Sequence, residues 1–166
     1  MYISFNISME FEIYGHTLKY DDGIFYRLWE YSCKRKFKPP VWKEIKPTKK
    51  DYVYFTLCNN YKKKTILVHR VVYWLHNPHW DLSDTSMFVD HIDRNKYNND
   101  IYNLRLVTPE ENCFNTNAKG CSFRKDVGKW TAYIRVKKKL KHLGFFELEE
   151  DAHQAYLDAK KIYHII

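Results

Sequence analysis

An Asp-His pair at Asp90 and His91 lies in a stretch rich in amide side chains, and these residue types suit one kind of reaction. The Asp90 carboxylate can offer a hard oxygen ligand to Mg²⁺ or Mn²⁺. An imidazole such as that of His91 can act as a general base near neutral pH. Asn112 can add a neutral oxygen ligand, and Asn103 can fix the loop or the histidine tautomer. A carboxylate-bound cation beside a general base suits the hydrolysis of a phosphodiester.

Two short strands and a long turn are expected to carry the Asp-His pair. The segments SMFVDH (86–91) and LRLVT (104–108) have the apolar content and the short length of strands. Between them, IDRNKYNND (92–100) has the Asn and Asp content of a turn. Neighbouring side chains of a regular strand point to opposite faces, but Asp90 and His91 stand where the first strand ends, and the turn relaxes that rule.

A helix is predicted to start directly after the second strand. Thr108 can serve as N-cap, Pro109 suits the first helical position, and Glu111 can close a capping box. Asn112 then falls within the first turns of this helix. The order over residues 84–117 is therefore strand, loop, strand, helix.

This part of the sequence resembles the motif of HNH endonucleases. The matching pieces are V-D-H-I-D (89–93), N-N (98–99) and N-L-R-L-V-T-P-E-E-N (103–112). The similarity is to the form found in phage and intron-encoded homing enzymes. It covers about residues 66–116 and includes the upstream V-H-R at 68–70. The resemblance implies a ββα-metal core and one divalent cation, Mg²⁺ or Mn²⁺. It also implies products with 5′-phosphate and 3′-hydroxyl ends.

The same resemblance implies roles for individual residues. His91 would be the general base and Asp90 a metal ligand. Asn103 would be a structural and orienting residue of the catalytic site. Asn112 would be the second metal ligand, at a position that is His or Asn in the family. Arg105 would either contact a DNA phosphate or brace the loop.

The net charge of +8 arises in one part of the chain. Residues 119–146 contain nine Lys or Arg and one acidic residue, whereas the rest of the chain contains 19 residues of each sign. A basic patch this local predicts a polyanionic partner.

The region 118–166 is expected to form three strands and one helix. GCSFRK, WTAYIRVKKK and KHLGFF are the predicted strands, and ELEEDAHQAYLDAKKIYH is the helix. The expected core consists of Trp130, Ala132, Ile134, Val136, Leu143, Phe145 and the alanines of the helix. The expected exposed basic face consists of Thr131, Tyr133, Arg135 and Lys137.

This region resembles the AP2 DNA-binding domain over about residues 119–160, on the pieces K-G-C-S-F-R-K, G-K-W-T-A-Y-I-R and L-G-F-F. The resemblance implies a sheet that lies in the major groove of double-stranded DNA. The basic groove-facing positions of the family match Lys119, Arg124 and Arg135, and Lys137 extends the same face. Another groove-facing Arg position falls on Leu140, so no sequence preference carries over.

Several other classes of protein are disfavoured. The cysteines form no CxxC pair, so a Cys-type zinc site and a disulfide framework are not expected. They are Cys33, Cys58, Cys113 and Cys121. No apolar run approaches the roughly 18–20 residues of a membrane span, and the N-terminus lacks the features of a signal peptide. An intracellular, not secreted, protein is expected.

The sequence therefore predicts an α+β protein with a β-rich region at 1–66, an HNH nuclease core at 67–117 and an AP2-like domain at 118–166. The predicted function is metal-dependent, homing-type cleavage of double-stranded DNA, in the cytoplasm of the host cell if the protein is phage-encoded. Nicking by a monomer or weak dimer is expected, because each chain has one site. Two alternatives stay open, namely an AP2-type DNA-binding regulator without nuclease activity and a DNA repair or packaging nuclease.

Overall fold

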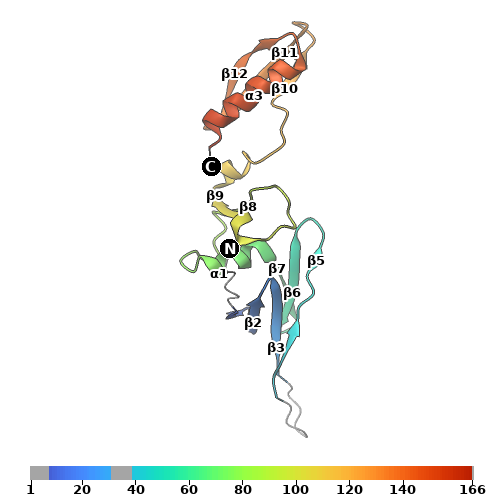
Figure 1. Cartoon of the computed structure of the whole chain (residues 1–166), viewed down its shortest axis with the longest axis vertical. Coiled ribbons are helices and arrows are strands. Elements are labelled where there is room, and N and C mark those ends of the chain that lie inside the picture. Colours follow the sequence, from blue (N-terminus) through green and yellow to red (C-terminus); the bar gives the residue numbers. More distant parts are fainter. Residues whose placement is uncertain (1–7, 31–38, 166) are drawn as a thin grey trace, which may run out of the picture. The chain divides into compact units, whose positions relative to one another are not determined.

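The computed structural model describes residues 8–30 and 39–165, and the chain divides into two compact units, residues 1–106 and 107–166 (Figure 1). Several antiparallel sheets and few helices make up these units, which confirms a mixed composition of strands and helices. Cys33 lies outside the described residues. None of the helices within the described ranges has the length and apolar composition that a membrane crossing requires.

The first unit contains two antiparallel sheets before the Asp-His pair. One sheet has the strand order β1-β2-β3-β4 and the other β5-β6-β7. Their bounds are β1 Met9–Ile13, β2 His16–Asp21, β3 Ile24–Trp29, β4 Val41–Glu44, β5 Thr48–Lys49, β6 Val53–Asn59 and β7 Lys62–Leu67. Tight two-residue turns join β1 to β2, β2 to β3 and β6 to β7.

The helix α1 (Val68–His76) begins where β7 ends and packs against these strands. Its residues Val71 and Val72 are almost completely buried. They belong to one apolar core together with residues of β2, β3, β6, β8 and β9. This core is continuous across position 66, where the sequence predicts a boundary. The predicted three-part division of the chain stays a prediction.

The predicted order of strand, loop, strand and helix is confirmed around the Asp-His pair. It consists of β8 (Phe88–His91), a short 3-10 helix η1 (Ile101–Asn103), β9 (Leu104–Val107) and α2 (Pro109–Asn112). β8 and β9 pair with each other in a two-stranded sheet. The short α2 belongs to the second unit.

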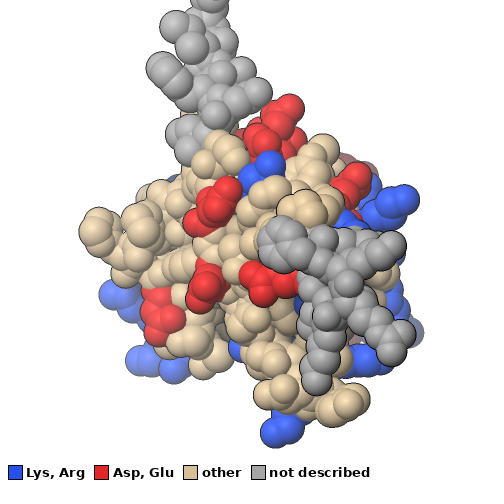
Figure 2. Space-filling view, turned by 90° about the horizontal axis from the view of Figure 1, so that it is seen from below, with Lys and Arg blue, Asp and Glu red and all other residues tan. Residues whose placement is uncertain are grey.

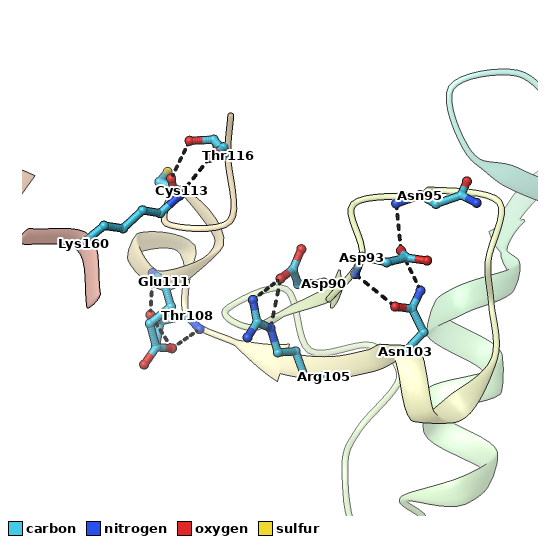
Figure 3. A network of polar contacts seen from close by, with 10 residues as sticks. All are labelled: Asp90, Asp93, Asn95, Asn103, Arg105, Thr108, Glu111, Cys113, Thr116 and Lys160. Carbon is cyan, nitrogen blue, oxygen red and sulfur yellow. Dashed lines mark hydrogen bonds and ion pairs between the residues drawn. The ribbon is translucent and has the colours of Figure 1, made fainter. Parts of the chain in front are cut away.

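The start of α2 is the predicted capping box. The Thr108 hydroxyl accepts from the Glu111 backbone N–H at 3.2 Å, and the Glu111 carboxylate accepts from the Thr108 N–H at 2.7 Å (Figure 3). Pro109 occupies the first turn, where its missing N–H removes no hydrogen bond. The local sequence thus determines where this helix begins.

The second unit forms a three-stranded antiparallel sheet that packs on one helix. The strands are β10 (Cys121–Arg124), β11 (Lys129–Val136) and β12 (Lys139–Phe146), in the order β10-β11-β12, and α3 (Glu149–Tyr163) lies along them (Figure 1). Ile134, Tyr156 and Ala159 form a buried cluster between sheet and helix. The arrangement of three strands and a helix is as predicted, and its kinship with AP2 domains stays a prediction.

Three side chains of this sheet differ from expectation. Lys137 lies in the β11–β12 turn rather than on the sheet face, because Val136 pairs with Lys139 and leaves only two residues for the turn. Thr131 is buried, because its hydroxyl bonds the His142 ring and Phe145 lies directly opposite. Phe145 is 49% exposed on that outer face, so its prediction as a core residue was wrong.

Candidate functional site

Asp90 and His91 are the last two residues of β8, and both side chains are buried, with exposures of 9% and 3%. The Asp90 Oδ2 accepts from Nε and Nη2 of Arg105 at 3.0 and 2.9 Å (Figure 3). Arg105 comes from β9, the partner strand of β8. A guanidinium that donates twice to one carboxylate holds that carboxylate in one orientation. A role of Arg105 in contacting a DNA phosphate stays a prediction.

The ring of His91 is oriented by an amide that the sequence analysis did not single out. His91 Nε2 lies 3.1 Å from the Asn99 Oδ1. Because an amide oxygen only accepts, the neutral ring carries its proton on Nε2 and its basic lone pair on Nδ1. Asn99 belongs to the N-N step of the turn, and the only sequence signal for it was that match to the motif.

A second buried imidazole packs beside His91. The ring of His69, from α1, stands edge-on with its centroid 5.0 Å from that of His91, and the Tyr52 ring lies tilted at 5.2 Å from that of His69. Burial, followed by the charges of His91 and Arg70, lowers the pKa of His69 to about 3. Among the residues that the structure describes, the His69 Nδ1 finds no hydrogen-bond partner. His69 is therefore a neutral packing partner of the proposed base at ordinary pH.

The turn between β8 and β9 is closed by a ladder of side-chain hydrogen bonds. Asn103 accepts from the Asp93 backbone N–H at 3.0 Å and donates to the Asp93 carboxylate at 2.9 Å (Figure 3). It also donates to the Asn98 carbonyl at 2.8 Å. The Asn98 side chain and then the Asn95 and Asn103 amides lower the pKa of Asp93. These contacts agree with the structural role expected for Asn103, and they give the amide-rich turn a defined shape.

Asn112 ends α2, and its backbone N–H donates to the Thr108 carbonyl at 2.9 Å. It belongs to the second unit, whereas Asp90 and His91 belong to the first. Its role as a metal ligand therefore stays a prediction from the motif.

The chemistry of the donor set bears on the expected cation. Within residues 8–30 and 39–165, no three His, Cys, Asp or Glu side chains gather closely enough to hold a metal ion. One carboxylate and one amide oxygen do fit Mg²⁺ or Mn²⁺, because Mg²⁺ is commonly bound by one or two carboxylates, with water and substrate phosphates as further ligands. The Asp90 carboxylate is therefore a suitable ligand for such a cation, and its pairing with Asn112 of the second unit stays a prediction from the motif.

The basic residues of the predicted DNA-binding sheet lie on the second unit, whereas Arg105 lies in the first. Lys119 forms an ion pair with Glu149, which raises the pKa of Lys119. Arg124 donates through Nε to Asp126 at 2.8 Å. Both side chains are exposed, so a phosphate would have to compete with these carboxylates. Arg135 lies exposed on the sheet face that is turned away from α3.

That outer sheet face also carries ordered polar groups. The Ser122 and Tyr133 hydroxyls lie 2.6 Å apart, and His142 Nε2 lies 2.9 Å from the Thr131 hydroxyl.

Positive charge is not spread evenly over the surface of the chain. The face drawn in Figure 2 shows Asp and Glu side chains across its middle and Lys and Arg mainly towards its margins.

Comparison with known proteins gives two findings. Residues 67–113 match the HNH endonuclease family. An uncharacterised HNH endonuclease of Acanthamoeba polyphaga mimivirus is 47% identical over 57 residues, which is 32% of this chain. The chain spans about 29% of the length of that relative. No solved structure matches the chain at a significant level. The two matches show that part of the chain is similar to an HNH endonuclease domain.

Proposed function

We propose that the chain is a metal-dependent endonuclease that hydrolyses phosphodiester bonds in double-stranded DNA. The observation that carries the proposal is the buried pair at the end of β8. His91 is oriented by Asn99 and stands beside Asp90, which Arg105 holds in place. All four residues lie within the segment 67–113 that matches the HNH endonuclease family.

His91 supplies the basic group of the reaction. Its Nδ1 takes a proton from the water that attacks phosphorus, while Asn99 keeps the ring from rotating. The neighbouring His69, neutral because its pKa is lowered to about 3, adds no positive charge that would oppose protonation of His91.

Asp90 and Asn112 are the residues that would hold the cation, and Arg105 keeps the Asp90 carboxylate in one orientation. A bound Mg²⁺ or Mn²⁺ would supply neutralisation of the charge that develops on the scissile phosphate. The proposal for Asn112 rests on its place in the motif.

The three-stranded sheet of the second unit is the proposed DNA-binding surface. Its outer face carries Arg124 and Arg135, and Lys137 extends from the tip of the β11–β12 turn. The excess positive charge of the chain lies in this region. Binding should therefore be strongly salt-dependent. Homing-type activity, nicking, the oligomeric state and an intracellular location stay predictions from the sequence.

The first experiment incubates supercoiled plasmid with purified protein, in Mg²⁺ or in EDTA, and compares wild type with His91→Ala. We expect relaxed product that requires both Mg²⁺ and His91, because His91 is the proposed acceptor of the proton from water. Linear product would instead indicate cleavage of both strands. His79→Ala, which removes an exposed histidine outside the site, is the matched control and should cleave normally.

His91→Ala should bind DNA as wild type does, as measured by fluorescence anisotropy in EDTA. Cleavage by His91→Ala at the wild-type rate would disprove the assignment of the base. Sequence-selective DNA binding with no cleavage, on plasmid carrying the bound site, would instead support the regulator alternative.

A further inference from the structure

Within the described residues, four hairpins are closed by two-residue turns in which both residues have a positive φ angle. These turns are Tyr14–Gly15, Asp22–Gly23, Asn60–Tyr61 and Lys137–Lys138. Such turns match the twist of the strands, and glycine is favoured in them because L side chains are strained at positive φ. Two of the four turns have this glycine, and the other two do not.

Of the three such turns in unit 1, the β6–β7 turn is the one without a glycine. Its first residue, Asn60, is of a type that tolerates a φ of 47°. Its second residue, Tyr61, is a bulky aromatic residue at a φ of 61°. The Tyr61 side chain is also fully exposed, at 101%, so no packing in the core offsets the strain. Backbone strain that no packing interaction offsets is a reason to look for a function.

The surroundings of Tyr61 indicate the kind of partner. Lys62 and Lys63 follow at once and are exposed at the start of β7. Lys64 comes next, with its Nζ 5.4 Å from the centroid of the Tyr14 ring. No Asp or Glu occurs between Tyr52 and Trp80. The tip of this hairpin therefore presents an aromatic ring beside two lysines, with no acidic residue nearby in the sequence.

We propose that the tip of the β6–β7 hairpin, residues 60–63, is a second DNA-contacting surface, in addition to the sheet of the second unit. Lys62 and Lys63 bind backbone phosphates, and the exposed ring of Tyr61 packs against a sugar or a base face. The assignment of DNA as the partner rests on the proposed nuclease function. The positive φ of the turn holds the ring out at the hairpin tip, where the core does not cover it.

The test measures binding of a labelled duplex of random sequence by fluorescence anisotropy, in EDTA, at several salt concentrations. Tyr61→Gly removes the ring and the strain together. We expect it to raise the melting temperature and to weaken binding by about tenfold, with an unchanged salt dependence. The double variant Lys62→Ala, Lys63→Ala should lower the slope of log K against log salt by about 1.8, because each phosphate contact contributes about 0.9.

Lys46→Ala is the matched control, because it removes one exposed lysine of the same unit. It should leave the slope close to that of wild type. If Lys46→Ala lowered the slope by half as much as the double variant, each lysine would have the same effect wherever it lies. That result would show a general charge effect and overturn the proposal. Binding of both hairpin variants with wild-type affinity and slope would also overturn it, while the nuclease function stands if wild type still cleaves plasmid. A wild type that neither binds nor cleaves DNA would overturn both.

Discussion

His69 shows how a buried side chain shapes the site without being a ligand or a base. It reaches the site from α1 and places its ring edge-on against His91. Burial keeps the ring neutral, because a charged imidazole would lose its hydration there. The ring therefore fills space beside the proposed base without adding charge.

This burial predicts a specific dependence of stability on pH. The pKa of His69 is lowered in the folded protein from 6.5 to about 3. Between these two pH values, His69 is therefore protonated in the unfolded chain and neutral in the folded chain. The stability is therefore complete above pH 6.5 and falls as the pH drops towards 3. Between those values the free energy of unfolding should fall by about 1.4 kcal/mol per pH unit from this residue.

Urea unfolding of wild type and His69→Leu at several pH values would measure that dependence. The variant should lack this part of the slope. His79→Leu, which replaces an exposed histidine, should keep the wild-type slope. Parallel curves for wild type and His69→Leu would show that His69 is not held neutral.

At the scale of elements, a glycine determines how closely α3 approaches the chain before β10. A Cβ added at Gly120 would overlap the ring of Tyr156, and the residue has a φ of +65°. Tyr156 is a member of the buried cluster between α3 and the sheet. The close contact of helix and sheet in the second unit thus requires a residue without a side chain at position 120.

Gly120→Ala should lower the free energy of unfolding of the second unit by about 3 kcal/mol, through overlap with the ring and strain at positive φ. Gly128→Ala is the matched control, because Gly128 has a φ of +69° but nothing within 4 Å of an added Cβ. It should cost only the strain, about 1 kcal/mol. Hydrogen exchange resolved by peptide would measure the loss of stability in the second unit apart from the first. Equal losses would contradict the role of Tyr156.

At the scale of the whole molecule, the proposed general base and the proposed DNA-binding sheet lie in different units. The Asp-His pair lies in the first unit, whereas the basic sheet lies in the second. Binding and cleavage should therefore be separable by mutation.

Arg135→Ala tests this separation. It should lower the slope of log K against log salt by about 0.9, because one phosphate contact is lost. The cleavage rate at saturating protein should stay that of wild type. Lys161→Ala is the control, because Lys161 lies on α3 and pairs with Asp158. An unchanged slope for Arg135→Ala would argue against the sheet face as the DNA contact.

The sequence by itself determined the local features of the site. The order of strand, turn, strand and helix, and the capping box at Thr108, follow from short-range patterns and from hydrogen bonds between residues three apart. The residues Asp90 and His91 stood out because their types and their motif indicate a nuclease. The buried face of β11 followed from simple alternation, with Ala132 and Ile134 turned towards the helix.

Only the tertiary structure decided which partners these residues have. Asn99 is one of several amides in its turn, and only the folded loop brings it to His91. His69 and Arg105 reach the pair from α1 and β9 through packing between segments far apart in the chain. The exposure of Phe145 and the place of Lys137 depend on the register of β11 and β12. Long-range pairing and burial depend on the whole fold, and local sequence patterns do not encode them.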